Sequence, residues 1–395
     1  MSEWKRYKLS DITSLSNGIN FDKSAYTSGV KLIGVADFKD RIYPDYNSLQ
    51  EVDSKVVRKG DYLERGDIVF VRSNGNKELV GRCMMIDQDI PVTYSGFCIK
   101  LRLMDKNIYD PIFFNYLFRT RQFRKAMIGT AVGANIQNLS QSRLCNCEVC
   151  VPDIEKQREI ATILSRYDSL IENYQKQIKL LEEAAQRLYK EWFVDLHFPG
   201  HENAKIVDGV PEGWEKKRIG DIVEYFDKQR KPLSSMQRMS MDKVYPYYGA
   251  ATLMDYVDNY IFEGIYLLLG EDGTVITPDN YPVLQYVWGK FWVNNHAHVL
   301  RGKDGISTEF LYAMFKEMPI ADVVTGAAQP KISQGRLSEK KVLMPPIELI
   351  LKWSDITKAC FDSYRNLSDK ILLLTEARDR LLPKLMSGEI EVGKE

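Results

Sequence analysis

Apolar residues recur along two segments of this chain at spacings that alternate between four and three. The first run starts at Ile160 and ends at Trp192, and a second run 193 positions later extends from Trp353 to Leu385. This spacing is typical of a coiled-coil seam, and it predicts two long helices that pack against each other. A seam buried in an ordinary core is the alternative, which the length and regularity of the runs argue against. The predicted seam residues are Ile171, Ile178, Leu181, Leu188, Trp192, Tyr364, Ile371, Leu374 and Leu381.

The two helices belong to a longer internal repeat. The segment "GAAQPKISQGRLSEKKVLMPPIE" (326–348) repeats "GTAVGANIQNLSQSRLCNCEVCVPDIE" (129–155), and we call these two the closing segments. At the other end of each half, "EWKRYKLSDI" (3–12) matches "GWEKKRIGDI" (213–222). The repeat predicts the order globular domain, helix, globular domain, helix, with bounds at 1–152, 153–193, 194–345 and 346–395.

Each globular domain enters its helix at the same end, so two helices that pair should be antiparallel and the halves should be related by a pseudo-two-fold axis. Within the domains, "GDIVFVRSNG" (66–75) and "GIYLLLGEDGTV" (264–275) are typical of buried strands that lead into glycine turns. The segments "YDPIFFNYLFRTRQFRKAM" (109–127) and "STEFLYAMFKEM" (307–318) each predict one helix. The expected fold class is therefore α+β, with two globular domains separated by two long antiparallel coiled-coil helices.

Composition and charge narrow the function. No apolar run approaches the ~18 residues of a membrane span, and no signal sequence opens the chain, so we expect a cytoplasmic protein without membrane contact. The net charge is zero, but residues 1–152 carry 22 Lys and Arg against 17 Asp and Glu, a net charge of +5. Residues 194–345 carry 17 against 20, a net charge of −3. A nucleic-acid binder with this distribution needs help from a more basic partner.

Metal sites are not predicted. Three cysteines lie close together at 145, 147 and 150, but no histidine is near and the second half does not repeat them, so buried strand cysteines are the simpler interpretation. The pairs His296/His298 and His197/His201 lack a convincing third ligand. We expect structural histidines there.

Catalytic motifs are also missing. The chain has no glycine-rich methyltransferase turn and no Gly-x-x-x-x-Gly-Lys-Ser/Thr loop for ATP. The "PDIEK" stretch (152–156) imitates a nuclease motif, yet its acidic residues stand at a helix start, where they favour the helix dipole. These absences favour a binding protein over an enzyme.

With its repeat, its two seams and its closing segments, the chain resembles the specificity subunit of type I restriction-modification enzymes. The segment "LYKEWFVDLHFPG" (188–200) is similar to that family's central conserved region. The segment "YPYYGAATLMDYVDNYIFEGIYLLLGEDGT" (245–274) resembles a target-recognition domain, and the likeness covers essentially the whole chain. Two departures are that the first closing segment lacks the Gln-Pro-Lys of the second, and that "IELIL" replaces the "IEKQRE" of the first half.

The resemblance implies a division of labour. Each target-recognition domain would read one half of a bipartite, asymmetric double-stranded DNA target, and the helices would fix the spacing. Two modification (methyltransferase) subunits with S-adenosylmethionine and two ATP-dependent restriction subunits with magnesium would bind to the chain. The chain itself would bind no cofactor and catalyse nothing. The alternative is a coiled-coil scaffold without DNA binding.

Candidate DNA-binding residues follow from the chemistry of base edges, which suits Arg, Lys, Asn and Gln on protruding loops. For any one of them a solvated loop position is an open alternative, and the polar residues of the closing segments either contact DNA or cap the helix. In the first domain the candidates are Arg72, Ser73, Asn74, Asn76, Lys77, Asn135, Gln137 and Asn138. In the second they are Gln229, Arg230, Lys231, Tyr247, Tyr248, Thr274, Gln329 and Lys331.

Overall fold

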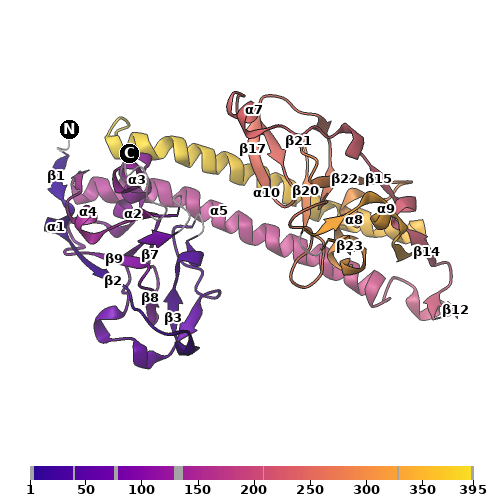
Figure 1. Cartoon of the computed structure of the whole chain (residues 1–395), viewed down its shortest axis with the longest axis horizontal. Helices are drawn as coiled ribbons and strands as arrows, with labels where there is room; N and C mark the ends of the chain where they lie inside the picture. The colour runs from indigo at the N-terminus through magenta and orange to yellow at the C-terminus, as the bar shows by residue number, and fades with distance from the viewer. Residues whose placement is uncertain are drawn as a thin grey trace. The chain divides into compact units, whose positions relative to one another are not determined.

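The computed structural model describes residues 4–38, 41–74, 79–128, 137–207, 209–326 and 329–392, with Asn74, Ile128 and Gln137 described by their backbone. The chain forms two compact units. Unit 1 combines Met1–Asn173 with Ile371–Glu395, and unit 2 is Tyr174–Lys370. Each unit therefore holds one globular domain and a part of both long helices. Figure 1 labels most of the helices and strands along the chain. Among the described residues, no helix is both long enough and apolar enough to cross a membrane.

The two predicted long helices are present. Helix α5 is Ile154–Tyr189 and continues into a π-helical turn, η5 (Lys190–Val194), and helix α10 is Ile347–Ser387. The carboxylate of Asp153 accepts a hydrogen bond from the backbone N–H of Lys156 (2.9 Å) and so caps the start of α5. Helix α10 ends just before Gly388, whose φ of 75° is the left-handed conformation that terminates many helices.

The helix pairing is antiparallel within each unit. In unit 1, Leu164 near the start of α5 shares a core with Leu385 near the end of α10. In unit 2, the rings of Tyr189 at the end of α5 and Trp353 near the start of α10 lie with centroids 6.0 Å apart. Further along α5 in unit 1, Asp168 pairs with Arg378, which precedes Leu385 on α10, and in unit 2 Tyr174 lies against Lys370 as Tyr189 lies against Trp353. Within each unit the two helices therefore run antiparallel, as the sequence predicted.

The predicted seam is reflected in the burial of the side chains. All nine seam residues are buried or half-buried, whereas Leu180, next to the seam residue Leu181, is 64% exposed. The two positions that break the apolar run are both satisfied. Thr357 is buried and its hydroxyl donates to the carbonyl of Trp353 (2.9 Å), and Arg378 forms an ion pair with Asp168 (2.5 Å).

Unit 1 contains two small sheets and, next to the start of α5, a separate pair of strands. The first sheet has the order β2 (Thr13–Asn17), β9 (Cys98–Leu103), β5 (Ile68–Val71), β7 (Cys83–Met85), all antiparallel. The second has the order β4 (Gln50–Val52), β3 (Tyr26–Ile33), β8 (Val92–Tyr94), and its β3–β8 pair is parallel. Strand β1 (Lys5–Lys8) pairs with β11 (Glu148–Val151), directly before α5. The helices are α1 (Leu9–Ile12), α2 (Pro111–Arg119), α3 (Arg121–Ile128) and α4 (Gln141–Cys145), with short 3₁₀ turns η1 (Lys23–Ala25), η2 (Val35–Asp37), η3 (Ser54–Val56) and η4 (Lys59–Asp61).

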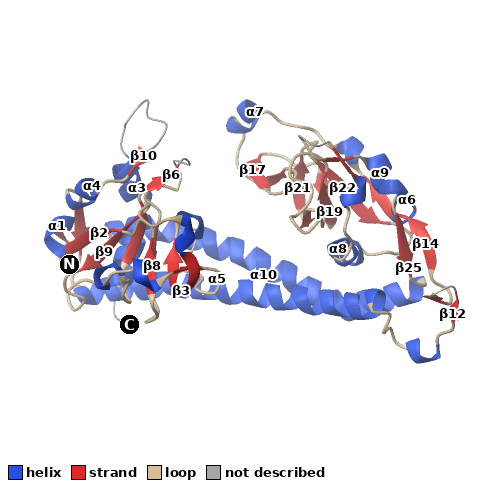
Figure 2. Cartoon of the chain, turned by 60° about the horizontal axis from the view of Figure 1, so that its bottom comes forward, coloured by secondary structure: helices blue, strands red, loops and turns tan. Residues whose placement is uncertain are grey.

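Unit 2 repeats this topology with one additional strand, β18, in its second sheet; most of its strands are labelled in Figure 1 and Figure 2. Its first sheet has the order β15 (Val223–Tyr225), β22 (Ala297–Gly302), β19 (Tyr266–Gly270), β20 (Leu284–Val287). The second has the order β17 (Leu253–Val257), β16 (Tyr245–Tyr248), β21 (Lys290–Val293), β18 (Phe262–Glu263), and its β16–β21 pair is parallel. Strand β14 (Glu215–Arg218) pairs with β25 (Lys341–Met344), directly before α10. The remaining elements are α6 (Ile219–Ile222), α7 (Ser235–Met239), α8 (Thr308–Lys316), α9 (Gln334–Glu339), η6 (His201–Asn203), η7 (Asp227–Gln229), η8 (Ala321–Val323) and the strands β12 (Ile206–Val207), β13 (Val210–Pro211), β23 (Val324–Thr325) and β24 (Lys331–Ile332).

The repeat in the sequence is thus a repeat in topology, and the α+β prediction is confirmed. One helix prediction was wrong. The segment 109–127 forms two helices, α2 and α3, because Thr120 has an extended conformation (ψ 145°). Its hydroxyl donates to the carbonyl of Leu117 (2.7 Å) and lies 3.3 Å from the backbone nitrogen of Phe123, so it bonds to the end of one helix and the start of the next.

Candidate nucleic-acid interface

In unit 1, three segments that are distant in sequence meet at the end of the central strand β5. Arg72 follows β5, and its backbone N–H donates to the carbonyl of Phe97 (2.8 Å), in the turn between β8 and β9. The carbonyl of Arg72 accepts from the N–H of Leu139 in the closing segment (2.8 Å). The next residues pair as two short strands, β6 (Ser73–Asn74) and β10 (Gln137–Asn138), which lie side by side in Figure 2. The described candidates Arg72, Ser73, Asn74, Gln137 and Asn138 therefore lie together.

Unit 2 has the same two backbone hydrogen bonds at the equivalent junction. The N–H of Glu271, after β19, donates to the carbonyl of His296 (2.8 Å), and the carbonyl of Glu271 accepts from the N–H of Ile332 (2.8 Å). Asp272 forms an isolated bridge with Lys331. We call the two junctions strand-end sites: residues 72–74, 97 and 137–139 in unit 1, and 271–274, 296 and 329–332 in unit 2.

The register of the strands shows which residues are equivalent. In unit 1 the central strands pair Ile68 with Leu101, and in unit 2 they pair Leu267 with Leu300. Counting along the strands places Glu271 where unit 1 has Arg72, His296 where it has Phe97, and His298 where it has Ile99. The scaffold is repeated, but the side chains that it presents are not.

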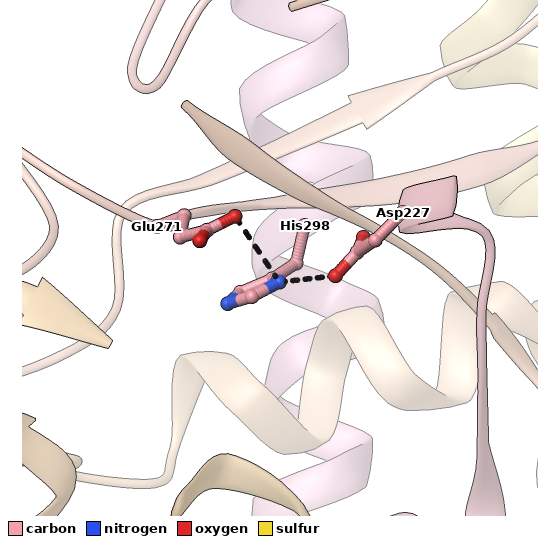
Figure 3. Close-up of side chains that lie close together, drawn as sticks. All are labelled: Asp227, Glu271 and His298. Atoms are coloured by element: carbon pink, nitrogen blue, oxygen red, sulfur yellow. Dashed lines mark hydrogen bonds and ion pairs between the residues drawn. The ribbon is translucent and has the colours of Figure 1, made fainter. Parts of the chain in front are cut away.

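A buried polar network holds the strand-end site of unit 2 (Figure 3). His298 is 1% exposed, and its Nδ1 lies 2.6 Å from Oδ2 of Asp227 and 3.7 Å from Oε2 of Glu271. Its Nε2 lies 2.8 Å from the carbonyl of Ile332 in the closing segment. The other oxygen of Asp227 accepts from the N–H of Val299 (2.9 Å). One histidine thus ties together η7, β22, the end of β19 and the closing segment.

Arg230 supplies the positive charge that this network needs. Its guanidinium donates to Oε2 of Glu271 (2.7 Å) and to the carbonyl of Ala297 (2.6 Å), and it lies 3.7 Å from Asp227. The ligand atoms of Asp227, Glu271 and His298 all lie within 4.8 Å, the only such three-residue group among the described residues. Because the guanidinium already occupies the Glu271 oxygen, an ion-pair network fits this cluster better than a metal does. His298 is therefore a buried structural histidine, as the sequence predicted, and its partners come from segments far away in sequence.

Comparison with known proteins agrees with this geometry. The model of the type I restriction modification DNA specificity domain matches residues 1–183 and 211–353. The chain belongs to this family. It carries two specificity domains, and each of them contains one strand-end site.

Named relatives are of the same kind. The chain is similar to the type I restriction enzyme MjaIX specificity subunit of Methanocaldococcus jannaschii, with 27% identity over 301 residues that cover 70% of this chain and 68% of the relative. It is also similar to the type I restriction enzyme HindI specificity subunit of Haemophilus influenzae, with 22% identity over 99% of this chain and all of the relative. Among solved structures, the S subunit of a type I restriction-modification system from M. genitalium matches with a TM-score of 0.59 and 19% identity, covering 97% of this chain and 96% of that one. The likeness to that structure supports the fold.

The candidate residues of the first specificity domain fall into three groups. Arg72 and Ser73 are half-buried, and Asn138 is exposed. The backbones of Asn74 and Gln137 pair with each other. The candidates outside the described residues are Asn76, Lys77 and Asn135.

In the second specificity domain, Arg230 is committed to the ion-pair network. Tyr247 is 1% exposed, and its hydroxyl accepts from the N–H of Leu233 (3.0 Å), so we remove it from the candidate DNA contacts. Tyr248 is half-buried, and burial raises its pKa to about 12. The exposed candidates are Gln229, Lys231, Thr274, Gln329 and Lys331.

The closing segments divide their polar residues between two tasks. The hydroxyls of Ser140 and Ser333 accept from the N–H groups of Arg143 (3.1 Å) and Arg336 (3.4 Å), and so cap α4 and α9. Asn138 and Lys331, two residues earlier in each copy, are exposed and make no cap. Capping and outward presentation therefore coexist in one segment.

Sequence reasoning gave no role at these sites to Phe97, Asp227 and Glu271, and it treated His296 and His298 only as structural histidines. An alignment of "YSGFCI" (94–99) with "VNNHAH" (293–298) would have needed the β-strand register, because the two stretches share no residue pattern. Only the pairing of β9 with β5, and of β22 with β19, makes them equivalent.

Proposed function

We propose that this chain is the DNA-reading subunit of a type I restriction-modification complex, and that each strand-end site reads one half of a bipartite target. The observation that carries the proposal is the repeated strand-end site within two domains of the DNA specificity family. In each copy a rigid backbone junction holds exposed polar side chains next to one another, the arrangement that base-edge recognition needs.

The two half-sites should differ in sequence. At equivalent positions, unit 1 presents the exposed side chains of Phe97 and Asn138 and unit 2 presents those of His296 and Lys331. A phenyl ring with an amide and an imidazole ring with an ammonium group do not favour the same bases. The target that we propose is therefore asymmetric.

Partner subunits complete the proposed activity. Modification subunits with S-adenosylmethionine would methylate the bound target, and ATP-dependent restriction subunits with magnesium would cleave unmodified DNA. This chain would contribute recognition and spacing. The first domain's surplus of positive charge is modest, so stable binding would depend on these partners.

A matched pair of variants tests the proposal. Asn138 and Lys331 occupy equivalent exposed positions in the two closing segments. Asn138→Ala should weaken binding to the first half-site by a factor of roughly 5 to 150, the range of one specific base contact, and Lys331→Ala should do so for the second. The measurements are the methylated motif of a genome that expresses the chain with its modification subunit, and duplex-binding assays on that motif.

The outcome separates this proposal from a coiled-coil scaffold. A scaffold would leave the methylated motif and DNA affinity unchanged in both variants. A uniform loss of affinity across sequences, with a smaller dependence on salt, would assign the residue to a phosphate contact. Failure of the wild-type complex to bind duplex DNA would refute DNA recognition altogether.

A further inference from the structure

Phe97 is an exposed aromatic residue at the strand-end site of unit 1. All 16 phenylalanines lie within the described residues, and Phe97, at 61% exposure, is the only one that is exposed. A large apolar side chain held out in solvent loses the free energy that burial would provide. An exposed phenylalanine therefore indicates a binding partner more strongly than an exposed lysine or serine does.

The backbone around Phe97 is fixed. Its carbonyl accepts from the N–H groups of Arg72 (2.8 Å) and Ser73 (3.4 Å). The N–H of Gly96 donates to the carbonyl of Ile19 (2.7 Å), and a Cβ on Gly96 would lie 2.1 Å from the side-chain oxygen of Asn20. The turn before Phe97 thus packs closely against the segment of Ile19 and Asn20. The ring projects from a rigid hairpin beside the candidate residues Arg72 and Ser73.

Unit 2 presents a ring at the equivalent place. His296 makes the same backbone bond, to Glu271, and its side chain is 47% exposed. Its Nδ1 is hydrogen bonded to the carboxylate of Asp272, which fixes the ring orientation. Both domains therefore carry an exposed ring at one position of the shared scaffold, apolar in the first and polar in the second.

We propose that Phe97 makes an apolar contact with nucleobases of the first half-site, and that this position helps to set which bases each domain accepts. The inference rests on the proposed DNA recognition. A phenyl ring can pack on a thymine methyl group in the major groove or insert between neighbouring bases. Both contacts use the same apolar surface of the ring. The imidazole of His296 offers polar atoms in its place, so the second half-site receives different chemistry.

The test uses the full chain in complex with its modification subunit, on duplexes that contain the methylated motif of the wild type. Phe97→Ala should weaken binding roughly tenfold, within the range of one specific base contact, and relax the motif at positions of the first half-site only. Phe97→Tyr, which keeps the ring, should retain most of the affinity. The control is Met104→Ala, because Met104 is equally exposed (63%) but follows the opposite end of β9.

Modified duplexes identify the kind of contact. Replacing each thymine of the half-site by uracil removes its methyl group, and a loss of affinity in the wild type but not in Phe97→Ala would indicate a methyl contact. A rise in 2-aminopurine fluorescence that depends on Phe97 would indicate insertion between bases.

Three results would overturn the inference while leaving the proposed function intact. The first is equal binding by Phe97→Ala and Met104→Ala. The second is a Phe97→Ala loss that is the same for every DNA sequence. The third is a variant that binds DNA normally but no longer assembles with the modification subunit, which would make the ring a protein contact. If the wild-type complex binds no duplex, the proposed function itself fails.

Discussion

Asp227 contacts a residue that is 71 positions away in sequence, because one of its carboxylate oxygens bonds to His298. The other oxygen accepts a hydrogen bond from the backbone N–H of Val299. Both oxygens are used inside the unit, and Arg230, three residues later, contacts Glu271 in the same network. The exposed candidates Gln229 and Lys231 stand between and beside these anchored residues. Their positions therefore depend on a network that faces inward.

Arg230→Ala should destabilise unit 2. Its side chain is 11% exposed and its ion-pair partner Glu271 is 15% exposed, and removing one member of a buried pair costs about 3 kcal/mol or more. Chemical denaturation measures this loss. Lys231→Ala, the exposed neighbour, should change the free energy of unfolding by less than about 0.5 kcal/mol. If Arg230→Ala unfolds like the parent and relaxes one base of the motif, Arg230 reads DNA directly.

The cysteines should differ sharply in reactivity. Burial raises the pKa of Cys83 to about 11 and that of Cys98 to about 12, from 9.0, so little thiolate forms at pH 8. Cys150 is exposed. Iodoacetamide at pH 8 should modify Cys150 first and leave Cys83 and Cys98 intact in the folded chain, as mass spectrometry of peptides would show.

The same thiols carry a pH dependence. A raised pKa in the folded state means that the stabilising contribution of these groups is complete below pH 9 and is lost as the pH rises toward 11 to 12. Rapid alkylation of Cys98 at pH 8, without unfolding, would contradict its buried position.

At this scale the sequence predicted residue types better than residue roles. Local pattern marked Arg230 as a DNA contact because it stands in a polar loop, and Tyr247 because its side chain could touch base methyl groups or the DNA backbone. The structure turns both inward, because their partners Glu271 and Leu233 reach them through tertiary packing. Asn138 and Lys331, by contrast, were marked by the repeat and are exposed at equivalent places.

Among the elements, both long helices were predicted and each begins one residue after its predicted bound, whereas α10 ends at Ser387, well before the predicted 395. The helices are predictable because a heptad pattern over some forty residues is set by the helix itself and needs no knowledge of distant contacts. The break at Thr120 escaped prediction, because the apolar pattern continues across it and only the hydroxyl bonds of one threonine divide α2 from α3. The short strands β6 and β10 could not be predicted from local pattern either, because each is a strand only by pairing with the other.

Adjacent leucines on α5 provide a test of the seam. Leu181→Asp places a charge on the half-buried face and should lower the stability of unit 2 by about 2 to 3 kcal/mol, the value of one buried leucine. Leu180→Asp, at a residue that is 64% exposed, should change it little. Thermal melts of the two variants make the comparison. Equal melting temperatures would mean that the helices are not held by this seam.

For the whole molecule, the division into units has a consequence for truncation. The end of α10 supplies Leu381, Leu382, Leu385 and Met386 to the core of unit 1. A fragment of residues 1 to about 200 lacks them, but the end of α5 in a second copy carries Leu188, Tyr189, Trp192 and Phe193 at the positions that the repeat makes equivalent.

We expect this fragment to form a closed two-fold dimer, the common outcome for identical chains. With a modification subunit, it should direct methylation to a palindromic site that repeats the first half-site. Light scattering gives the oligomeric state, and sequencing of methylated bases gives the target. A monomeric fragment, or one that still methylates the asymmetric site, would show that the halves are not interchangeable.

Unit 1 combines the two ends of the chain, so during synthesis it can be completed only after unit 2 has been made. Its first 173 residues leave the ribosome long before Ile371–Glu395, because the 197 residues of unit 2 are made in between. At about 5 to 20 residues per second this interval lasts roughly 10 to 40 seconds. Throughout it, the apolar positions Ile160, Ala161 and Leu164 lack the α10 residues that complete their core. During this interval the nascent first domain exposes apolar surface, so the chain is then most prone to aggregate, to bind chaperones and to pair with a second copy that is being made on the same mRNA.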